Sequence, residues 1–164
     1  MRKKKSWVEK LNNSKGLPRV AEITKKMRKK WGKGTIVIPA PLEVDALMRQ
    51  VPRGKLVTIN QIRVALAKKH NATIGCPITT GIFASIAAHA ADEQREEGIK
   101  DITPYWRVLR ADGVINPKYP GGVEGQRTLL EEEGHTVIPR GKKLVVADYV
   151  KSLVKLHDLM VSLA

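Results

Sequence analysis

The sequence has little of several residue types, and each shortage excludes a class of protein. Its one cysteine, Cys76, excludes an intrachain disulfide and a metal cage built from cysteines. A reducing compartment is the default for such a chain, so we expect a cytoplasmic protein, nucleoid-associated if the source is bacterial. No apolar run approaches the roughly 18 residues of a membrane span, and we expect no membrane partner. The basic start runs into polar sequence, which does not fit a secretory signal.

Aromatic residues and histidines are also sparse. One phenylalanine, three tryptophans and three tyrosines occur in 164 residues, so leucine, isoleucine, valine and alanine must fill the core. Two of the aromatic residues, Tyr105 and Trp106, are adjacent, which indicates a position with a specific use. The histidines lack the spacing of a metal site, and we expect neither a metal nor a cofactor. They are His70, His89, His135 and His157.

Positive charge, in contrast, is abundant and unevenly placed. Residues 1–33 contain 13 Lys or Arg and 2 acids, which gives a net charge of +11 out of +14 for the whole chain. A basic arm on a nearly neutral body is typical of a protein that binds a nucleic acid. RNA satisfies the charge as well as DNA does, and a solvated basic tail is the structural alternative. The candidate phosphate contacts are Lys25, Lys26, Arg28, Lys29 and Lys30.

Two apolar stripes at helical spacing predict two short amphipathic helices in this arm, broken at residues 12–16. They either dock on the body or become ordered only on DNA. The first stripe is Trp7, Val8 and Leu11, and the second is Val20, Ile23, Thr24 and Met27.

The next segments predict a short strand at 35–38, a helix at 42–51 and a second helix from Thr58 to about Lys69. Thr58 and Gln61 have the spacing of a capping box. A third helix is expected to begin near Thr79, with small residues on one face and, on the opposite face, the apolar positions Ile82, Phe83, Ile86, Ala87 and Ala90. This pattern favours a helix-turn-helix, whose small side chains allow close approach to a groove, and an ordinary helical hairpin about equally. The small residues are Gly81, Ala84, Ser85 and Ala88.

The rest of the chain predicts a C-terminal cap for this domain. The acidic segment 92–98 should face away from DNA, and residues 111–125 should form a loop. A short helix at 126–133 stops at Gly134, and residues 135–146 form a hairpin. Asp148 is expected to cap a last helix.

Five segments stand in a distinctive order along the chain. They are Val51-Pro52-Arg53-Gly54-Lys55-Leu56-Val57-Thr58-Ile59, Gly75-Cys76-Pro77-Ile78-Thr79-Thr80-Gly81-Ile82-Phe83, Pro104-Tyr105-Trp106-Arg107-Val108, Tyr119-Pro120-Gly121-Gly122 and Leu129-Leu130-Glu131-Glu132-Glu133-Gly134. From about residue 42 to 136 the chain thereby resembles the DNA-binding domain of 6-O-alkylguanine-DNA alkyltransferases and alkyltransferase-like proteins. That family shows I-P-x-G-x-V-x-T-Y, G-x-P-x-A-A-R-A-V, P-C-H-R-V, Y-x-G-G and L-L-x-x-E-G in the same order.

The departures from this pattern bear on the chemistry. In the family, the cysteine of P-C-H-R-V attacks the alkyl group, activated by the adjacent histidine through a chain that ends at the glutamate of E-G. The resemblance places Tyr105 at the nucleophile's position and Trp106 at the histidine's, while Glu133 is retained. A phenol with a pKa near ~10 is protonated at neutral pH and has no general base beside it, so we expect no alkyl transfer. Without its partners, Glu133 is interpreted as a helix-end hydrogen-bonding residue, and Cys76 as structural.

Two more departures concern base extrusion. The resemblance places Ile59 where the family has a tyrosine that pushes on the target phosphate, and Gly81 where an arginine fills the vacated stack. Extruding a base costs a few kcal/mol, so the loss of both groups argues against efficient flipping. Tyr105 and Trp106 either plug the former pocket as core, which we favour, or stack on a flipped base. Arg107 is expected to bond backbone carbonyls of its loop.

We therefore predict a mainly α fold with a small β-hairpin, of winged-helix or helix-turn-helix type. Its parts are a basic extension (1–34), an alkyltransferase-like DNA-binding domain (35–138) and a C-terminal strand and helix packed on that domain (139–164). The expected function is non-enzymatic binding of duplex DNA, mostly through its backbone, related to DNA repair and with a repair-protein partner. The alternatives are an alkylated-base sensor using Tyr105 and Trp106, or an RNA- or partner-binding module. Beside the basic residues of the arm, the positions expected at the DNA are Thr58, Ile59, Thr79, Thr80, Gly81 and Ser85.

Overall fold

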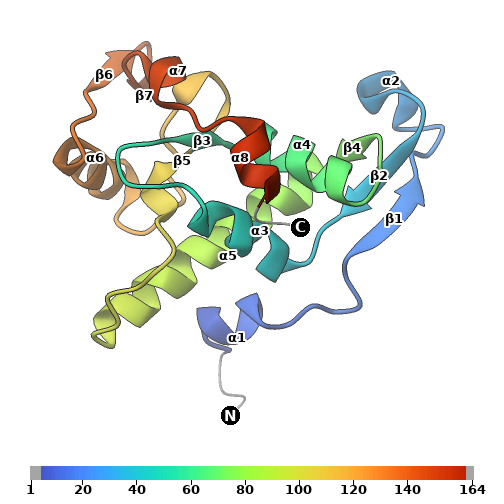
Figure 1. Cartoon of the computed structure of the whole chain (residues 1–164), viewed down its shortest axis with the longest axis horizontal. Helices are drawn as coiled ribbons and strands as arrows, with labels where there is room; N and C mark the ends of the chain where they lie inside the picture. The colour runs from blue at the N-terminus through green and yellow to red at the C-terminus, as the bar shows by residue number, and fades with distance from the viewer. Residues whose placement is uncertain (1–4, 162–164) are drawn as a thin grey trace.

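Short helices dominate the fold, with three small sheets between them (Figure 1). The computed structural model describes residues 5–161. The predicted class, mainly α with a small β-hairpin, is confirmed. The helices are α1 (Trp7–Leu11), α2 (Arg28–Trp31), α3 (Pro41–Arg49), α4 (Ile59–Lys69), α5 (Pro77–Glu96), α6 (Gly122–Glu132), α7 (Tyr149–Ser152) and α8 (Leu156–Val161), with the 3₁₀ turns η1 (Tyr105–Arg107) and η2 (Ala111–Gly113). The strands are β1 (Arg19–Glu22), β2 (Thr35–Ile38), β3 (Val57–Thr58), β4 (Ile74–Gly75), β5 (Val108–Leu109), β6 (Val137–Arg140) and β7 (Lys143–Val146).

The N-terminal arm is part of the folded body. Strand β1 pairs antiparallel with β2, and β2 pairs parallel with β4. The predicted helix over Val20, Ile23, Thr24 and Met27 is therefore wrong, because Arg19–Glu22 pair with a distant strand and Thr24 to Met27 form only a local turn. Val20 lies opposite Val37, and the Ile23 N–H donates to the Gly34 carbonyl at 2.9 Å. The predicted boundary at residue 34 falls inside this β-ribbon.

Helix α1 matches the first predicted stripe and docks on α5. The Ser6 hydroxyl accepts the backbone N–H of Glu9, as an N-cap residue does. The carboxylate of Glu93, on α5, accepts the backbone N–H groups of Trp7 at 3.0 Å and Val8 at 3.2 Å. These first-turn N–H groups have no partner within their own helix, so Glu93 anchors α1 through charge-assisted bonds.

The helices predicted at 42–51 and 58–69 are confirmed as α3 and α4. Thr58 caps α4 in the predicted capping box: the Gln61 N–H donates to its hydroxyl, and its own N–H donates to the Gln61 side chain. Helices α3, α4 and α5 pack around one core, which includes Val44, Leu47 and Ile62.

Helix α5 begins at Pro77, slightly before the predicted start, and its buried face is predicted only in part: Ala87 and Ala90 are buried as expected, but so are Ala84 and Ala88 of the opposite face. The small residues are the buried ones, and the large aliphatic residues Ile78 and Ile82 are 59% and 51% exposed. Small side chains allow α5 to pack closely against α1 and α3, which leaves its larger residues outside. The buried positions are Thr80, Ala84, Ala87, Ala88, Ala90 and Ala91.

The C-terminal region follows the prediction except at its end. Strands β6 and β7 form the predicted hairpin, and α6 begins at Gly122, earlier than expected. The last predicted helix is instead two short ones, α7 and α8. Asp148 adopts a left-handed φ of 53° and makes no side-chain cap bond, so it redirects the chain before α7. Within residues 5–161, no helix is both long and apolar enough to cross a membrane.

Candidate nucleic-acid interface

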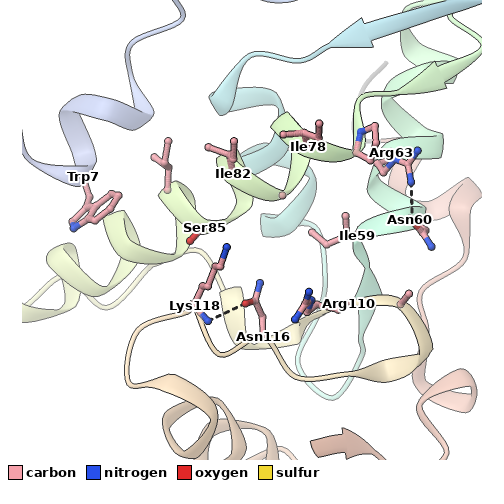
Figure 2. A pocket seen from close by; sticks show the side chains of 14 residues that line it. Trp7, Ile59, Asn60, Arg63, Ile78, Ile82, Ser85, Arg110, Asn116 and Lys118 are labelled. Carbon is pink, nitrogen blue, oxygen red and sulfur yellow. Dashed lines mark hydrogen bonds between the residues drawn. The ribbon is translucent and has the colours of Figure 1, made fainter. Parts of the chain in front are cut away.

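A groove of about 690 Å³ runs along α5 and is bounded by the start of α4 and by the loop at residues 110–118. Figure 2 shows Trp7 at one end of this groove and Arg63 at the other, with the residues of α5 between them. Arg63, Arg110 and Lys118 supply positive charge, and none of the described residues that line the groove is acidic. Such a surface attracts a polyanion. The remaining lining residues are Trp7, Ile59, Asn60, Pro77, Ile78, Gly81, Ile82, Ser85, Ile86, Ala111 and Asn116.

Arg63 is held in place at the junction of α4 with the strand that precedes α5. Its Nε donates to the Gly75 carbonyl at 3.0 Å, and its Nη1 donates to Asn60 Oδ1 at 3.1 Å (Figure 2). Partial burial lowers the pKa of its guanidinium, which nevertheless stays charged at neutral pH. Gly75 lets the backbone of β4 lie close to the backbone of α4, because a Cβ at Gly75 would lie 2.6 Å from the backbone carbonyl oxygen of Arg63. The backbone geometry therefore presents a fixed cation to the groove.

The structure brings together three of the six predicted contact positions outside the arm. Ile59, Gly81 and Ser85 all line the groove. Thr79 and Thr80 do not meet the prediction that their hydroxyls anchor a phosphate, because both hydroxyls are buried and bond to no described residue. Thr58 is also buried, at 8% exposure, and its hydroxyl accepts a bond in the capping box.

The five predicted basic contacts form a separate exposed cluster, which we call the α2 knob. It consists of Lys25, Lys26, Arg28, Lys29 and Lys30, on α2 and the turn before it, and all five are exposed. No ion pair among residues 5–161 involves any of them. The ribbon of β1 and β2 fixes the knob to β4, which directly precedes α5. A second groove of about 490 Å³ lies along α4 and β4, and shares Asn60 and Arg63 with the first.

Neither residue of the adjacent aromatic pair, Tyr105 and Trp106, is among the described residues that line the groove. Tyr105 is 1% exposed and packs edge-on against Trp106 and Tyr119, with ring centroids 5.3 Å and 5.9 Å away. The Arg95 guanidinium donates to its hydroxyl at 2.8 Å. Burial raises the pKa of the Tyr105 phenol, and this hydrogen bond opposes the rise only in part. A neutral, enclosed phenol is a packing group and a poor nucleophile.

Glu133 connects this aromatic pair to the rest of the domain. Its carboxylate accepts Trp106 Nε1 at 2.6 Å, Arg107 at 2.9 Å and the Gly54 N–H at 3.0 Å. Burial alone would raise the pKa of Glu133, but these bonds outweigh it and hold the pKa below its usual range. Arg107 also donates to the Val51 carbonyl at 2.7 Å, in a different loop from the one expected. The indole N–H of Trp106 only donates, so it cannot take a proton from Tyr105.

Sequence reasoning missed several residues of the groove. Arg63 and Asn60 stand three apart on a predicted helix, a spacing that places them on one face, and this signal could have indicated them. Arg110, Asn116 and Lys118 lie in an irregular loop, where no periodicity indicates which side chains meet the helices. Their position depends on tertiary packing alone.

A cationic groove along two packed helices, with an exposed basic cluster beside it, defines a DNA-binding domain of helix-turn-helix type. The comparison with known families is more specific. The chain belongs to the family described as "6-O-methylguanine DNA methyltransferase, DNA binding domain", whose model matches residues 40–135. A comparison with curated proteins found no match.

A solved structure shares this fold. It is the crystal structure of S. pombe Atl1 in complex with damaged DNA containing O6-carboxymethylguanine. The two chains are 20% identical with a TM-score of 0.50, and the match covers 70% of this chain and 94% of that chain. The N-terminal ribbon with α1 and α2, and the last two helices, lie outside the family match.

Proposed function

We propose that this protein binds duplex DNA without enzymatic activity, as an alkyltransferase-like protein related to DNA repair. The observation that carries the proposal is the groove along α5, which has three cations and no carboxylate among its described lining residues. Arg63, Arg110 and Lys118 would contact phosphates along this groove. The α2 knob would add contacts that are independent of base sequence.

The lack of enzymatic activity follows from the proposed position of Tyr105 at the family's nucleophile. Its hydroxyl is buried and bonded to Arg95, and the neighbouring indole has no acceptor nitrogen that could serve as a base. Incubation with a duplex that contains 6-O-methylguanine should therefore leave the mass of the protein unchanged. A gain of one methyl group would contradict this part of the proposal.

DNA binding is tested through Arg63. Arg63→Ala removes a fixed cation from the groove, so we expect the binding free energy for duplex DNA to become less favourable by about 1–2 kcal/mol. The slope of log affinity against log salt should also decrease by about 1, which corresponds to the loss of one phosphate contact. Fluorescence anisotropy at several salt concentrations measures both quantities. The matched control is Arg127→Ala, which removes an exposed arginine from α6, outside the groove. Equal affinity of wild type and Arg63→Ala, or binding that does not weaken with salt, would contradict the proposal.

Recognition of alkylated guanine is a second candidate, favoured by the fold shared with an Atl1 complex that contains damaged DNA. We propose the groove, and not the buried Tyr105, as the place where such a base would lie. Anisotropy with matched duplexes, one carrying 6-O-methylguanine, distinguishes this function from plain DNA binding. Tighter binding of the modified duplex would support a sensor, and equal binding would leave the first function alone.

A further inference from the structure

The exposed part of α5 carries an aliphatic pair in the groove, whose only charged lining residues among those described are the cations Arg63, Arg110 and Lys118. Ile78 and Ile82 are four residues apart, which puts them one helical turn apart on the same face. Both line the groove together with Arg63, Arg110 and Lys118 (Figure 2). Two large aliphatic side chains exposed next to each other on one helix face offer an apolar surface, and covering that surface with a partner is favourable.

The backbone beside this pair is open. A Cβ built on Gly81 would meet no atom within 4 Å, so nothing on the helix surface fills the space between Ile78 and Ile82. A partner can therefore approach the helix backbone closely at this point. The positive charge of the surrounding side chains attracts a polyanion. A polyanion therefore fits this surface better than an apolar partner without acidic groups.

Duplex DNA offers an aliphatic side chain two kinds of surface. Apart from the methyl group of thymine, the edges of the bases are polar, and covering them with an isoleucine would leave donors and acceptors without partners. The faces of the bases are apolar and become available where two stacked pairs separate. An isoleucine that enters this gap meets an apolar surface on both sides, as the apolar wedges of architectural DNA-binding proteins do.

We infer that Ile78 and Ile82 form an aliphatic wedge that inserts at a base step, unstacks it and bends the duplex. This inference rests on the proposed DNA binding and adds its mode. The cations on the rim hold the backbone, and the aliphatic pair separates the bases between them. Because an aliphatic side chain makes no base-specific hydrogen bond, selectivity follows the ease of unstacking, so pyrimidine–purine steps are preferred.

Two fluorescence measurements test the wedge. Duplexes carrying 2-aminopurine at successive positions report unstacking as a rise in fluorescence, and end-labelled duplexes report bending by energy transfer. Both are recorded at saturation, with anisotropy on the same samples to establish binding. We expect wild type to raise both signals, and the double variant Ile78→Ala/Ile82→Ala to bind with most of both rises lost. Thermal melts by circular dichroism verify that the variant is folded.

The matched control is Leu42→Ala on α3, which removes a side chain of similar exposure, 47%, outside the groove. It should leave both signals at the wild-type level, and an equal loss in this control would overturn the wedge. Binding of wild type without a rise in 2-aminopurine fluorescence would also overturn the wedge. So would a double variant whose fluorescence and energy-transfer signals equal those of wild type, since the pair would then not contact the bases. A wild-type chain that does not bind the duplex at all contradicts the proposed function instead.

Discussion

Glu133 holds two other segments of the chain, one through Gly54 and the other through the adjacent residues Trp106 and Arg107. Glu133→Gln keeps its shape but removes the charge that pairs with Arg107. We expect the free energy of unfolding at pH 7 to fall by about 1–3 kcal/mol, since a buried cation loses its counter-charge. Urea denaturation followed by circular dichroism measures this. The control Glu97→Gln, at an exposed acid beyond α5, should stay within about 0.5 kcal/mol of wild type.

The same contacts predict how the difference in unfolding free energy between wild type and Glu133→Gln depends on pH. Because the pKa of Glu133 is lower in the folded state, its contribution is fully present above the unfolded pKa of about 4.3 and is lost as pH falls through the folded value. Stability of wild type and Glu133→Gln should therefore converge in acid, below about pH 4. The pKa of Glu43 is lowered too, where hydrogen bonds from Lys69 and others outweigh burial, but it titrates in both proteins and cancels in the difference. Curves that remain parallel from neutral to acidic pH would contradict the assignment.

Sequence reasoning at this scale identified residues better than it identified contacts. It predicted hydrogen-bonding roles for Glu133 and Arg107, and the two residues form an ion pair with each other. It did not pair them, because they are 26 residues apart and only the fold brings the α6 end to η1. The buried hydroxyl of Thr80 shows the converse limit. A threonine near a helix start is a reasonable phosphate contact from sequence alone, but the packing of α5 buries the hydroxyl of Thr80.

Helix α1 has five residues, too few for stability on its own, so its structure depends on α5. Glu93→Ala removes the carboxylate that accepts the N–H groups of Trp7 and Val8. We expect a loss of about 1–2 kcal/mol at this contact and partial release of α1. Limited trypsin digestion should then cut faster at Lys10 and Lys15, with the fragments identified by mass spectrometry. The control Glu96→Ala, at an exposed position of α5, should be digested at the wild-type rate. Equal digestion rates for Glu93→Ala and Glu96→Ala would contradict the anchoring role of Glu93.

Local signals predicted elements where the stabilising contacts are local. The capping box of Thr58 and Gln61 gave the start of α4, because both partners lie within one turn. The strand at Arg19–Glu22 was missed, since its partner β2 lies beyond an intervening helix and apolar spacing alone fits a helix there too. The buried face of α5 was predicted only in part. Ala87 and Ala90 are buried as expected, but Ala84 and Ala88 are buried too and Ile82 is exposed, because hydrophobicity favours isoleucine inside whereas close helix packing requires alanine.

On the scale of the whole molecule, the family domain is flanked by an extension that contacts both ends of α5. Helix α1 packs against α5 through Glu93, and β2 is bonded to β4 just before α5 begins. Charge composition predicted a nucleic-acid partner for residues 1–33, but it could not show that the segment is built into the domain. The α2 knob is consequently attached through the β1–β2 ribbon to β4, which directly precedes α5.

That position predicts which cations DNA binding depends on. The α2 knob and the β6–β7 hairpin lie at opposite ends of the long axis of the molecule (Figure 1). Two triple variants remove the same formal charge from the two ends. The first, in the knob, is Arg28→Gln/Lys29→Gln/Lys30→Gln, and the second, in the hairpin, is Arg140→Gln/Lys142→Gln/Lys143→Gln. If the knob contacts phosphates, the first variant should reduce the slope of log affinity against log salt by about 1–3, whereas the second should leave it near the wild-type value. Anisotropy titrations across a range of salt concentrations measure both slopes. Equal reductions would mean that net charge alone attracts the duplex, with no defined contact at the knob.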